Sequence, residues 1–469
     1  MKEHPLQIKS STVTSQLRSG KFRLLQKMES LKHQRIGLNR LFRRKPLLVI
    51  ALIGLAIRFA LAPFFGHPYD LRIFMAVSWA VAHGISPYSQ YVLHEIFQNM
   101  PHPHLHGSFY GIGYPPTWGL ILSLMYQISS LINPNDIYTL VLSLKIPIIA
   151  GDLVTSLVIY KILEVKLNKQ VAFKAFCIYQ FCPFMIVVGA VWGMFDILVF
   201  LLSILSAYLL LEKVEWSLTS LAFACSLKTY PIVLAPLYSI FIYKKTHSVK
   251  RAFSYSFGVT GLLSLITIIP MAVFNWPISN LYCALASHTS LYDNGEASYT
   301  YGAASPFNLY NVFKLIDPAI RPHWILNYLW IAAVVTSYFY ALLRISDVNF
   351  TSIINWSFLV SLTFFTTRFW VSEQNLILLF SLFLLVVLFN RTRISWKFIH
   401  ALWILFFTFV LIHVPVIAFN WIVDPPSLNA AVAFSDGPLG PFRWVLMSVL
   451  TLSWLIILWH YSIKGKVLR

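Results

Sequence analysis

Residues 46–64 read PLLVIALIGLAIRFALAPF, an apolar run with a single charged residue, Arg58. A helix of about 20 such residues spans the ~30 Å hydrocarbon core of a bilayer, and comparable runs recur from Pro46 to the C-terminus. Of the 469 residues, 58% are hydrophobic and 11% charged, whereas a soluble domain carries about 25% charged residues. The sequence therefore excludes a soluble fold and predicts an all-α, multi-pass membrane protein.

The net charge of +19 resides mainly in short segments between the apolar runs. The positive-inside rule accounts for this distribution, so we expect no nucleic-acid partner. Residues 1–45 contain twelve Lys or Arg against two Glu and no long apolar run. We interpret them as a basic cytoplasmic tail that contacts anionic membrane lipids, and residues 46–469 as the transmembrane domain.

The remaining positive charge predicts how the chain crosses the membrane. About eleven or twelve spanning segments, with both termini cytoplasmic, place the basic segments on one side. This topology requires residues 117–132 to form an embedded or interfacial helix. The break at residues 228–231 predicts two antiparallel half-helices within residues 217–243, with a single kinked helix as the alternative. Six segments should face the cytoplasm: 161–174, 212–216, 244–251, 344–349, 390–397 and 464–469.

The opposite, extracytoplasmic side then carries two long polar loops, residues 65–138 and 275–323. The first loop contains Asp70 and Arg72 immediately after the first helix. A carboxylate at this water interface could take a proton from a hydroxyl, which makes Asp70 the candidate general base. A helix N-cap is the structural alternative for Asp70.

Two further features of the first loop bear on its chemistry. Tyr114 belongs to a rigid Tyr-Pro-Pro segment that would support a pocket. His102, His104 and His106 alternate, but no Cys or carboxylate lies among them. We therefore expect no metal site there, and no cofactor.

Ionisable residues inside apolar runs mark either a function or a buried partner. Lys145 and Asp152 are seven residues apart, which places them on one helix face. The two side chains would pair with each other, or Lys145 would contact a phosphate near the outer face. The spacing favours neither possibility.

Polar and aromatic residues also gather at the other outer helix ends. Each could simply cap a helix or anchor it at the interface. Taken together, they place acids, cations and aromatic rings on one side of the membrane, as a site for a sugar and a phosphate requires. These residues are Trp192, Asp196, Lys228, Tyr230, Arg368 and Glu373.

This arrangement resembles the GT-C glycosyltransferases, polytopic enzymes that use polyprenyl- or dolichyl-phosphate sugars. Asp70 is similar to the catalytic acid of the family's first loop. Residues 113–116, Gly-Tyr-Pro-Pro, resemble the Gly-x-Asp-Tyr-Pro-Pro element of the dolichyl-phosphate-glucose-dependent glucosyltransferases of N-glycan assembly. Residues 192–196, Trp-Gly-Met-Phe-Asp, resemble their Trp-Gly-Gln-Phe-Asp type of element, and residues 228–231, Lys-Thr-Tyr-Pro, resemble the Lys-x-Tyr-Pro turn of the glycolipid mannosyltransferases.

The sequence departs from the family pattern at two places. The first loop reads Asp-Leu-Arg where the family carries Asp-x-Asp, which removes a metal-ligand partner. Glu373 falls where the glucosyltransferases carry His-Glu-Lys, but Ser372 and Gln374 flank it here. Metal dependence and the donor contacts of those flanking groups are therefore not carried over.

The resemblance implies an inverting hexosyltransferase whose site is extracytoplasmic. Mannose or glucose would pass from a polyprenyl- or dolichyl-phosphate donor to a lipid-linked oligosaccharide or glycolipid acceptor. Lys228 and Arg368, with Arg72 and Lys145 as additions, would stabilise the leaving phosphate. The membrane would be the cell membrane of a prokaryote or the endoplasmic reticulum of a eukaryote. The alternatives are a transporter or flippase of a lipid-linked glycan and a lipid-binding scaffold without catalysis.

Overall fold

The computed structural model describes residues 45–464, except 101, 103–104, 106, 283–302, 321–322, 391–395, 428, 431–432, 434–436 and 438. The predicted tail, His104 and His106 lie outside the described residues, as does part of the second long loop. The chain forms two compact units, Met1–Gly54 and Leu55–Arg469. The boundary falls inside α2 (Pro46–Leu61), and the second unit contains all other described elements.

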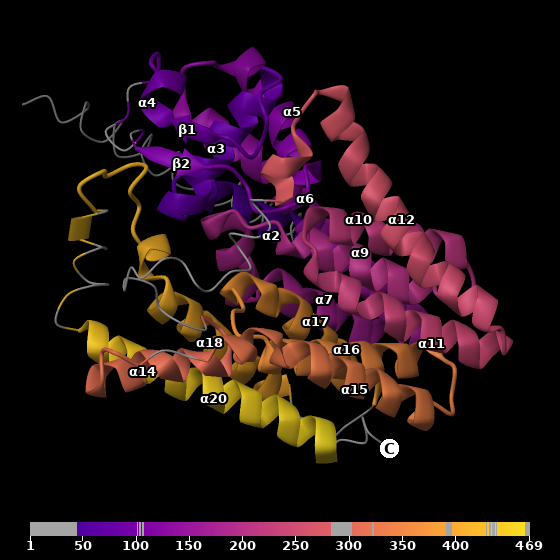
Figure 1. Ribbon diagram of the computed structural model, residues 1–469. Helices are drawn as coiled ribbons and strands as arrows, with labels where there is room; N and C mark the ends of the chain where they lie inside the picture. The colour runs from indigo at the N-terminus through magenta and orange to yellow at the C-terminus, as the bar shows by residue number, and fades with distance from the viewer. Residues whose placement is uncertain are drawn as a thin grey trace, which may run out of the picture. The chain divides into compact units, whose positions relative to one another are not determined.

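The second unit is predominantly helical, which confirms the predicted all-α class. Its β structure, among the described residues, is the antiparallel pair β1 (Gln90–Val92) and β2 (Ser108–Tyr110) and an isolated bridge from Ala303 to Val371. Its α-helices, labelled in Figure 1 where there is room, are α3 (Pro68–Ala82), α4 (Leu93–Ile96), α5 (Thr117–Ile132), α6 (Ile137–Lys166), α7 (Lys169–Gln180), α8 (Pro183–Ile186), α9 (Asp196–Leu209), α10 (Val214–Leu227), α11 (Leu234–Thr246), α12 (Val249–Val273), α14 (Leu309–Ile316), α15 (Leu329–Arg344), α16 (Phe350–Thr367), α17 (Leu376–Phe389), α18 (Trp396–His413) and α20 (Gly440–Lys464).

Six helices of the described chain are long and apolar enough to cross a membrane: α6, α12, α15 with the turn before it, α16, α18 and α20. A seventh span results if α7 and the segment Pro183–Trp192, bent by 47°, count as one. The apolar helices α2, α5, α9, α10 and Glu373–Phe389 are shorter. The expectation of about eleven or twelve spans requires several of these shorter helices to cross as well.

Helices α9 to α12 alternate in direction. Lys228, which follows α10, bonds to Asp196 at the start of α9, and Ser217 near the start of α10 lies 3.0 Å from Ser206 near the end of α9. Lys245 at the end of α11 donates to the carbonyl of Leu211 in the α9–α10 turn. One end of this group therefore contains the starts of α9 and α11 and the end of α10. We call it the Asp70 end, because Asp70 also lies there. The turns after α9 and α11 lie at the opposite, lysine-rich end.

The α10–α11 pair distinguishes the two predictions for residues 217–243. Ser217 of α10 and Ser239 of α11 both reach the same turn of α12, through hydrogen bonds of 2.9 Å to Tyr255 and 2.7 Å to Ser256. In one continuous helix these two serines would lie roughly 30 Å apart, at 1.5 Å per residue. The two half-helices are therefore antiparallel, as the sequence predicted, and the single kinked helix is excluded.

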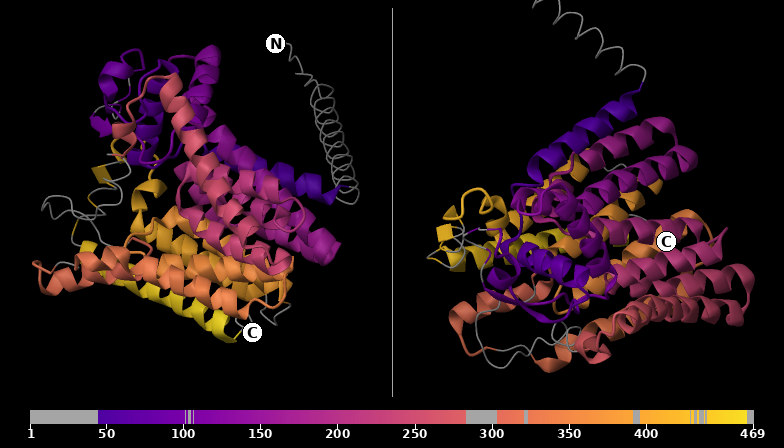
Figure 2. Two further views of the ribbon diagram at one scale, coloured as in Figure 1. Left: turned by 45° about the vertical axis from the view of Figure 1, so that its right-hand side comes forward. Right: turned by 90° about the horizontal axis from the view of Figure 1, so that it is seen from above.

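The core and the periphery differ in burial. Helix α17 is buried at every position from Leu376 to Leu388, and α16 packs beside it. Helices α12 and α15 instead bury few of their residues and expose large apolar side chains, including Phe257 and Phe339. The later helices form a group beside α9–α12, drawn in orange and yellow against magenta (Figure 1, Figure 2). The exposed apolar surface of α12 and α15 suits contact with lipid rather than with water.

Candidate functional site

The start of α3 positions Asp70. The N-cap of α3 is His67, whose ring accepts a hydrogen bond from the backbone N–H of Asp70 at 3.2 Å. Pro68 occupies the first helical turn, where its missing N–H costs nothing. The alternative that Asp70 itself caps the helix is therefore wrong, because His67 holds the cap. Asp70 lies in the first turn, where the helix dipole favours its negative charge.

The carboxylate of Asp70 is oriented but not enclosed. Its Oδ2 accepts a hydrogen bond from Trp192 Nε1 at 2.8 Å and lies 3.1 Å from His67 Nδ1. The rings of His67 and Trp192 stack with centroids 5.2 Å apart. Oδ1 has no hydrogen-bond donor among the described residues, and 20% of the side chain is exposed. A fixed carboxylate with one accessible oxygen is the geometry that proton abstraction requires.

His67 is neutral near pH 7. Burial lowers the pKa of His67 below its ordinary value of 6.5, Asp70 partly opposes this, and Arg72 lowers the pKa further. Because Nδ1 accepts the backbone N–H of Asp70, we assign the ring proton to Nε2. The Asp70 carboxylate therefore lies beside an uncharged ring.

A second cluster surrounds Asp196 in the first turn of α9. Lys228 Nζ donates to Asp196 Oδ2 at 2.7 Å, and the Tyr230 hydroxyl donates to Oδ1 at 3.3 Å. The Lys228 ammonium also lies 5.2 Å from the ring centre of Tyr114 and 5.0 Å from that of Phe195. Cation–π contacts of this type are worth about 0.5–2 kcal/mol.

The structure shows what holds the Asp196 side chain, and its donor contact stays a prediction. Its side chain is 0% exposed, and both oxygens already accept hydrogen bonds from Lys228 and Tyr230. Asp196 instead holds the Lys228 ammonium and the Tyr230 hydroxyl in place. The sequence identified the residue but not the two partners that its carboxylate oxygens bind.

Tyr114 lies between the two clusters. Burial raises the pKa of Tyr114 well above 10.0, and the charges of Asp70 and Asp196 raise it further. Its ring meets Phe195 edge-on at 5.3 Å, and its carbonyl accepts a hydrogen bond from the Tyr88 hydroxyl at 3.0 Å. The predicted convergence of Asp70, Trp192, Tyr114 and Lys228 is thus present in the structure.

Glu373 belongs to a third group at the same end. It begins the short helix Glu373–Asn375, and its carboxylate contacts Nδ1 of His413, the last residue of α18. Arg443 donates to the His413 carbonyl at 3.1 Å, and His413 interacts electrostatically with His67. Sequence reasoning missed His413 and Arg443, although an ionisable residue at the end of an apolar run was an available signal.

The two remaining predicted cations differ in their surroundings. Arg72 donates from Nε to the carbonyl of Pro68 at 2.5 Å and acts electrostatically on His67, so it lies beside Asp70. Arg368 ends α16 and lies over the ring of Phe364 at 5.3 Å, and burial lowers its pKa from 12.5. Within the described residues no hydrogen bond joins Arg368 to the Asp70 cluster, so its place in a shared site stays a prediction.

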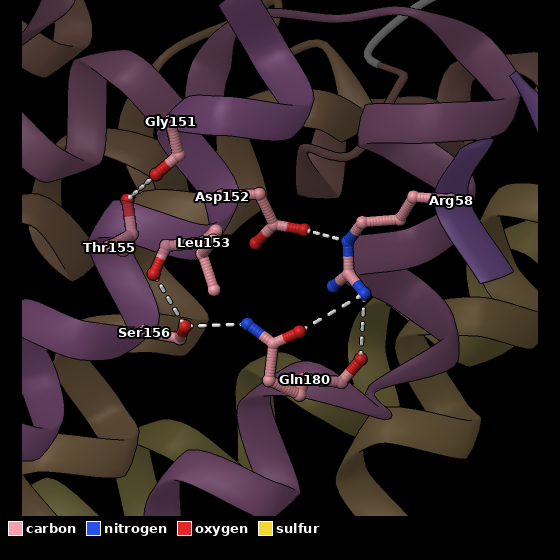
Figure 3. Close-up of polar contacts among 7 residues, drawn as sticks. All are labelled: Arg58, Gly151, Asp152, Leu153, Thr155, Ser156 and Gln180. Carbon is pink, nitrogen blue, oxygen red and sulfur yellow. Dashed lines mark hydrogen bonds and ion pairs between the residues drawn. The ribbon is translucent and has the colours of Figure 1, made fainter. Parts of the chain in front are cut away.

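The alternative in which Lys145 pairs with Asp152 is wrong. Asp152 Oδ2 pairs with Arg58 Nε, and both side chains are buried (Figure 3). Arg58 also donates from Nη1 to the Gln180 backbone carbonyl at 3.0 Å. Helical spacing showed that Lys145 and Asp152 share a face of α6, but it could not show which neighbouring helix supplies their partners.

The predicted phosphate contact of Lys145 is also wrong. Its side chain is buried, and Nζ donates to four backbone carbonyl oxygens at 2.6–3.0 Å. An ammonium has three N–H groups, so none is left for a phosphate. Lys145 is therefore removed from the ligand-contacting residues.

In the described part of the chain, no group of three or more His, Cys, Asp or Glu side chains is placed to hold a metal ion. No protein-family model matches the chain, and no curated protein sequence matches it. The functional conclusion therefore depends on the fold and on the geometry at the Asp70 end.

Proposed function

We propose that the protein is a membrane glycosyltransferase. It moves mannose or glucose from a polyprenyl- or dolichyl-phosphate donor to a lipid-linked oligosaccharide or glycolipid acceptor. The observation that carries the proposal is the oriented, partly exposed carboxylate of Asp70, with the Lys228 ammonium held at the same end of the helices. Asp, His and Trp side chains around one accessible carboxylate oxygen suit a hydroxyl acceptor on a sugar.

The reaction is an inverting displacement. Asp70 takes the proton of the acceptor hydroxyl as that oxygen bonds to the anomeric carbon of the donor hexose. The bond between the anomeric carbon and the phosphate oxygen breaks, and the lipid phosphate leaves with the electron pair. General base catalysis of this kind contributes about 10²–10⁴-fold.

The leaving phosphate requires fixed positive charge nearby. Lys228 supplies part of it, but Asp196 neutralises much of its field because the two charges are 2.7 Å apart. Arg72, beside His67, and Arg368 complete the positive charge in this proposal. Lys228 is accordingly a weaker phosphate ligand than its position in the sequence suggested.

The charge distribution supports an extracytoplasmic site. The lysine-rich end and the turns aligned with it carry most of the described positive charge, which the positive-inside rule assigns to the cytoplasm. With that orientation both termini are cytoplasmic and the Asp70 end is extracytoplasmic. The residues concerned are Lys161, Lys166, Lys169, Lys174, Lys213, Lys244, Lys245, Lys250, Arg251, Arg344 and Lys397.

A transporter or flippase of a lipid-linked glycan is the second candidate. The observation in its favour is the charged residues deep among the helices, since such residues mark ion or substrate pathways in transporters. Arg58 and Asp152, however, are each 1% exposed and pair with each other. Paired, inaccessible charges favour a structural role, so we place the enzyme first.

The deciding experiment uses the purified protein in detergent, where no membrane separates two compartments. Radiolabelled polyprenyl-phosphate mannose and glucose are offered separately with lipid-linked oligosaccharide and glycolipid acceptors. A glycosyltransferase moves label from one of the donors to an acceptor. If no label moves in detergent, but proteoliposomes translocate a labelled lipid-linked glycan, the protein is a transporter.

A further inference from the structure

Lys145 of α6 is a buried cation held by backbone oxygens alone. Its side chain is 1% exposed, and no carboxylate contacts it among the described residues. Two of the carbonyls lie just past the end of α2, and two lie in the last turn of the π-helix Val187–Trp192. Nζ lies 2.9 Å from Ala62 O, 2.6 Å from Phe65 O, 2.9 Å from Ala190 O and 3.0 Å from Val191 O.

This environment requires a positive charge. Carbonyl oxygens only accept hydrogen bonds, and the carbonyls at a helix C-terminus carry the negative end of the helix dipole. Two such ends meet at one ammonium. Without the cation, four oxygens with partial negative charge would face one another at a largely buried site.

The two segments that Lys145 joins are those that carry Asp70 and its hydrogen-bond donor. Phe65 precedes His67 by two residues, and Val191 directly precedes Trp192. The backbone N–H of His67 also reaches Trp192 O at 3.4 Å. A shift between the segments would therefore move Trp192 Nε1 relative to Asp70 Oδ2.

The packing around the lysine stem is equally close. Gly193 adopts φ +93, a left-handed conformation that favours glycine, and a Cβ there would come within 3.0 Å of Lys145 Cε. The chain thus turns against the lysine stem before α9 begins. The position of Trp192 is consequently set by both the charge and the stem of Lys145.

We infer that Lys145 is a positioning residue, which holds the backbone segments of Asp70 and Trp192 together so that the indole orients the general base. Its effect on activity rests on the proposed glycosyl transfer, whereas its effect on the Trp192–Asp70 contact does not. Removing the side chain beyond Cβ leaves a carbonyl-lined space. Propylammonium has the atoms that Lys145→Ala removes, so it should bind there and restore the contact.

The Arg58–Asp152 pair provides a matched control. Asp152 lies two turns further along α6 and pairs with Arg58 of α2, which also bonds to Gln180 of α7 (Figure 3). Helices α2 and α7 lead to the same two segments. The pair joins helix bodies and does not touch the backbone next to Asp70. Asp152→Asn should therefore change stability without changing the contact between Trp192 and Asp70.

The first measurement is independent of activity. Protein labelled with 5-fluorotryptophan gives a ¹⁹F resonance for Trp192, which is assigned by its loss in Trp192→Phe. We expect Lys145→Met and Lys145→Ala to shift this resonance, as Asp70→Asn does, and Asp152→Asn to leave it in place. Propylammonium should return the Lys145→Ala resonance towards its wild-type position, and tetramethylammonium, which has no N–H donor, should not.

The second measurement is turnover with the donor that the wild-type protein uses. Misplacing a reacting group by 1 Å costs about 10²-fold, so Lys145→Ala should lose about that factor and regain most of it in propylammonium. Unchanged Trp192 resonances in both Lys145 variants would overturn the inference. The same conclusion follows if neither variant folds even in propylammonium while Asp152→Asn folds, because Lys145 would then stabilise the whole fold. If the Trp192 resonance shifts in the Lys145 variants and returns in propylammonium, but no protein, wild type included, shows turnover, then the positioning role stands and glycosyl transfer is refuted.

Discussion

The buried ion pair between Lys228 and Asp196 is broken by one substitution, Lys228→Ala. Asp196 is 0% exposed and would keep a carboxylate with no counter-charge. Removing one partner of a buried ion pair costs about 3–5 kcal/mol. The cation–π contacts with Tyr114 and Phe195 are lost too, so we expect the free energy of unfolding to fall by at least about 3 kcal/mol.

The control for this substitution removes both charges. In Asp196→Asn/Lys228→Met, the asparagine carbonyl still accepts the Tyr230 hydroxyl and the methionine fills the space of the lysine stem. Replacing a buried ion pair by uncharged groups is often neutral, so the double variant should be clearly more stable than Lys228→Ala. Its turnover then reports on the charge of Lys228 in a folded protein.

The assay is equilibrium unfolding in mixed detergent micelles, followed by circular dichroism for wild type, Lys228→Ala, Lys228→Met, Asp196→Asn and the double variant. A double-mutant cycle gives the coupling between the two side chains. The reasoning is refuted if Lys228→Ala costs less than about 1 kcal/mol, the value typical of exposed ion pairs. The pair would then be solvated, and the Lys228 ammonium would be accessible to a phosphate after all.

Two further predictions concern pH and membrane orientation. Because folding lowers the pKa of His67 below 6.5, its neutral form stabilises the protein fully above pH 6.5, and this contribution is lost as the pH falls through the lowered pKa. In His67→Asn, which keeps an N-capping oxygen, the melting temperature should therefore fall less steeply below pH 6.5 than in the wild type. An equally steep fall would contradict the assignment. The membrane orientation is tested in a variant with the four native cysteines replaced. The exposed position Tyr69→Cys should react with an impermeant maleimide on intact cells or sealed luminal-side-out vesicles, whereas Trp216→Cys should react only after permeabilisation. The reverse pattern would place Asp70 in the cytoplasm.

The helices and their alternation were predictable because they depend on local properties. Apolar length identifies a membrane-crossing helix, and the spacing of basic segments identifies which turns share a side. The break at Lys228 predicted the antiparallel pair α10 and α11, which hydrogen bonds to α12 confirm. The same alternation brought Asp70, Trp192 and Lys228 to one end before any contact was known.

The partners of buried charges were not predictable in the same way. Arg58 and Asp152 are 94 positions apart, and Lys145 meets carbonyls whose residue types carry no signal in the sequence. Helical periodicity states which residues share a face, but not which helix covers that face. His413 was missed for a related reason, because its partner Glu373 follows a different span.

The role of Asp70 is the central claim, and one substitution tests it most directly. In Asp70→Asn the amide oxygen can still accept the Trp192 N–H, so the fold is retained while the base is lost. Asp136→Asn is the control, since Asp136 caps α6 and asparagine is an equally good N-cap. The measurement is the rate of hexose transfer from labelled donor to acceptor by the purified variants. We expect Asp70→Asn to lose at least about 10²-fold, or about 2.7 kcal/mol of transition-state stabilisation, while Asp136→Asn matches wild type. Transfer by Asp70→Asn at the wild-type rate would contradict the account.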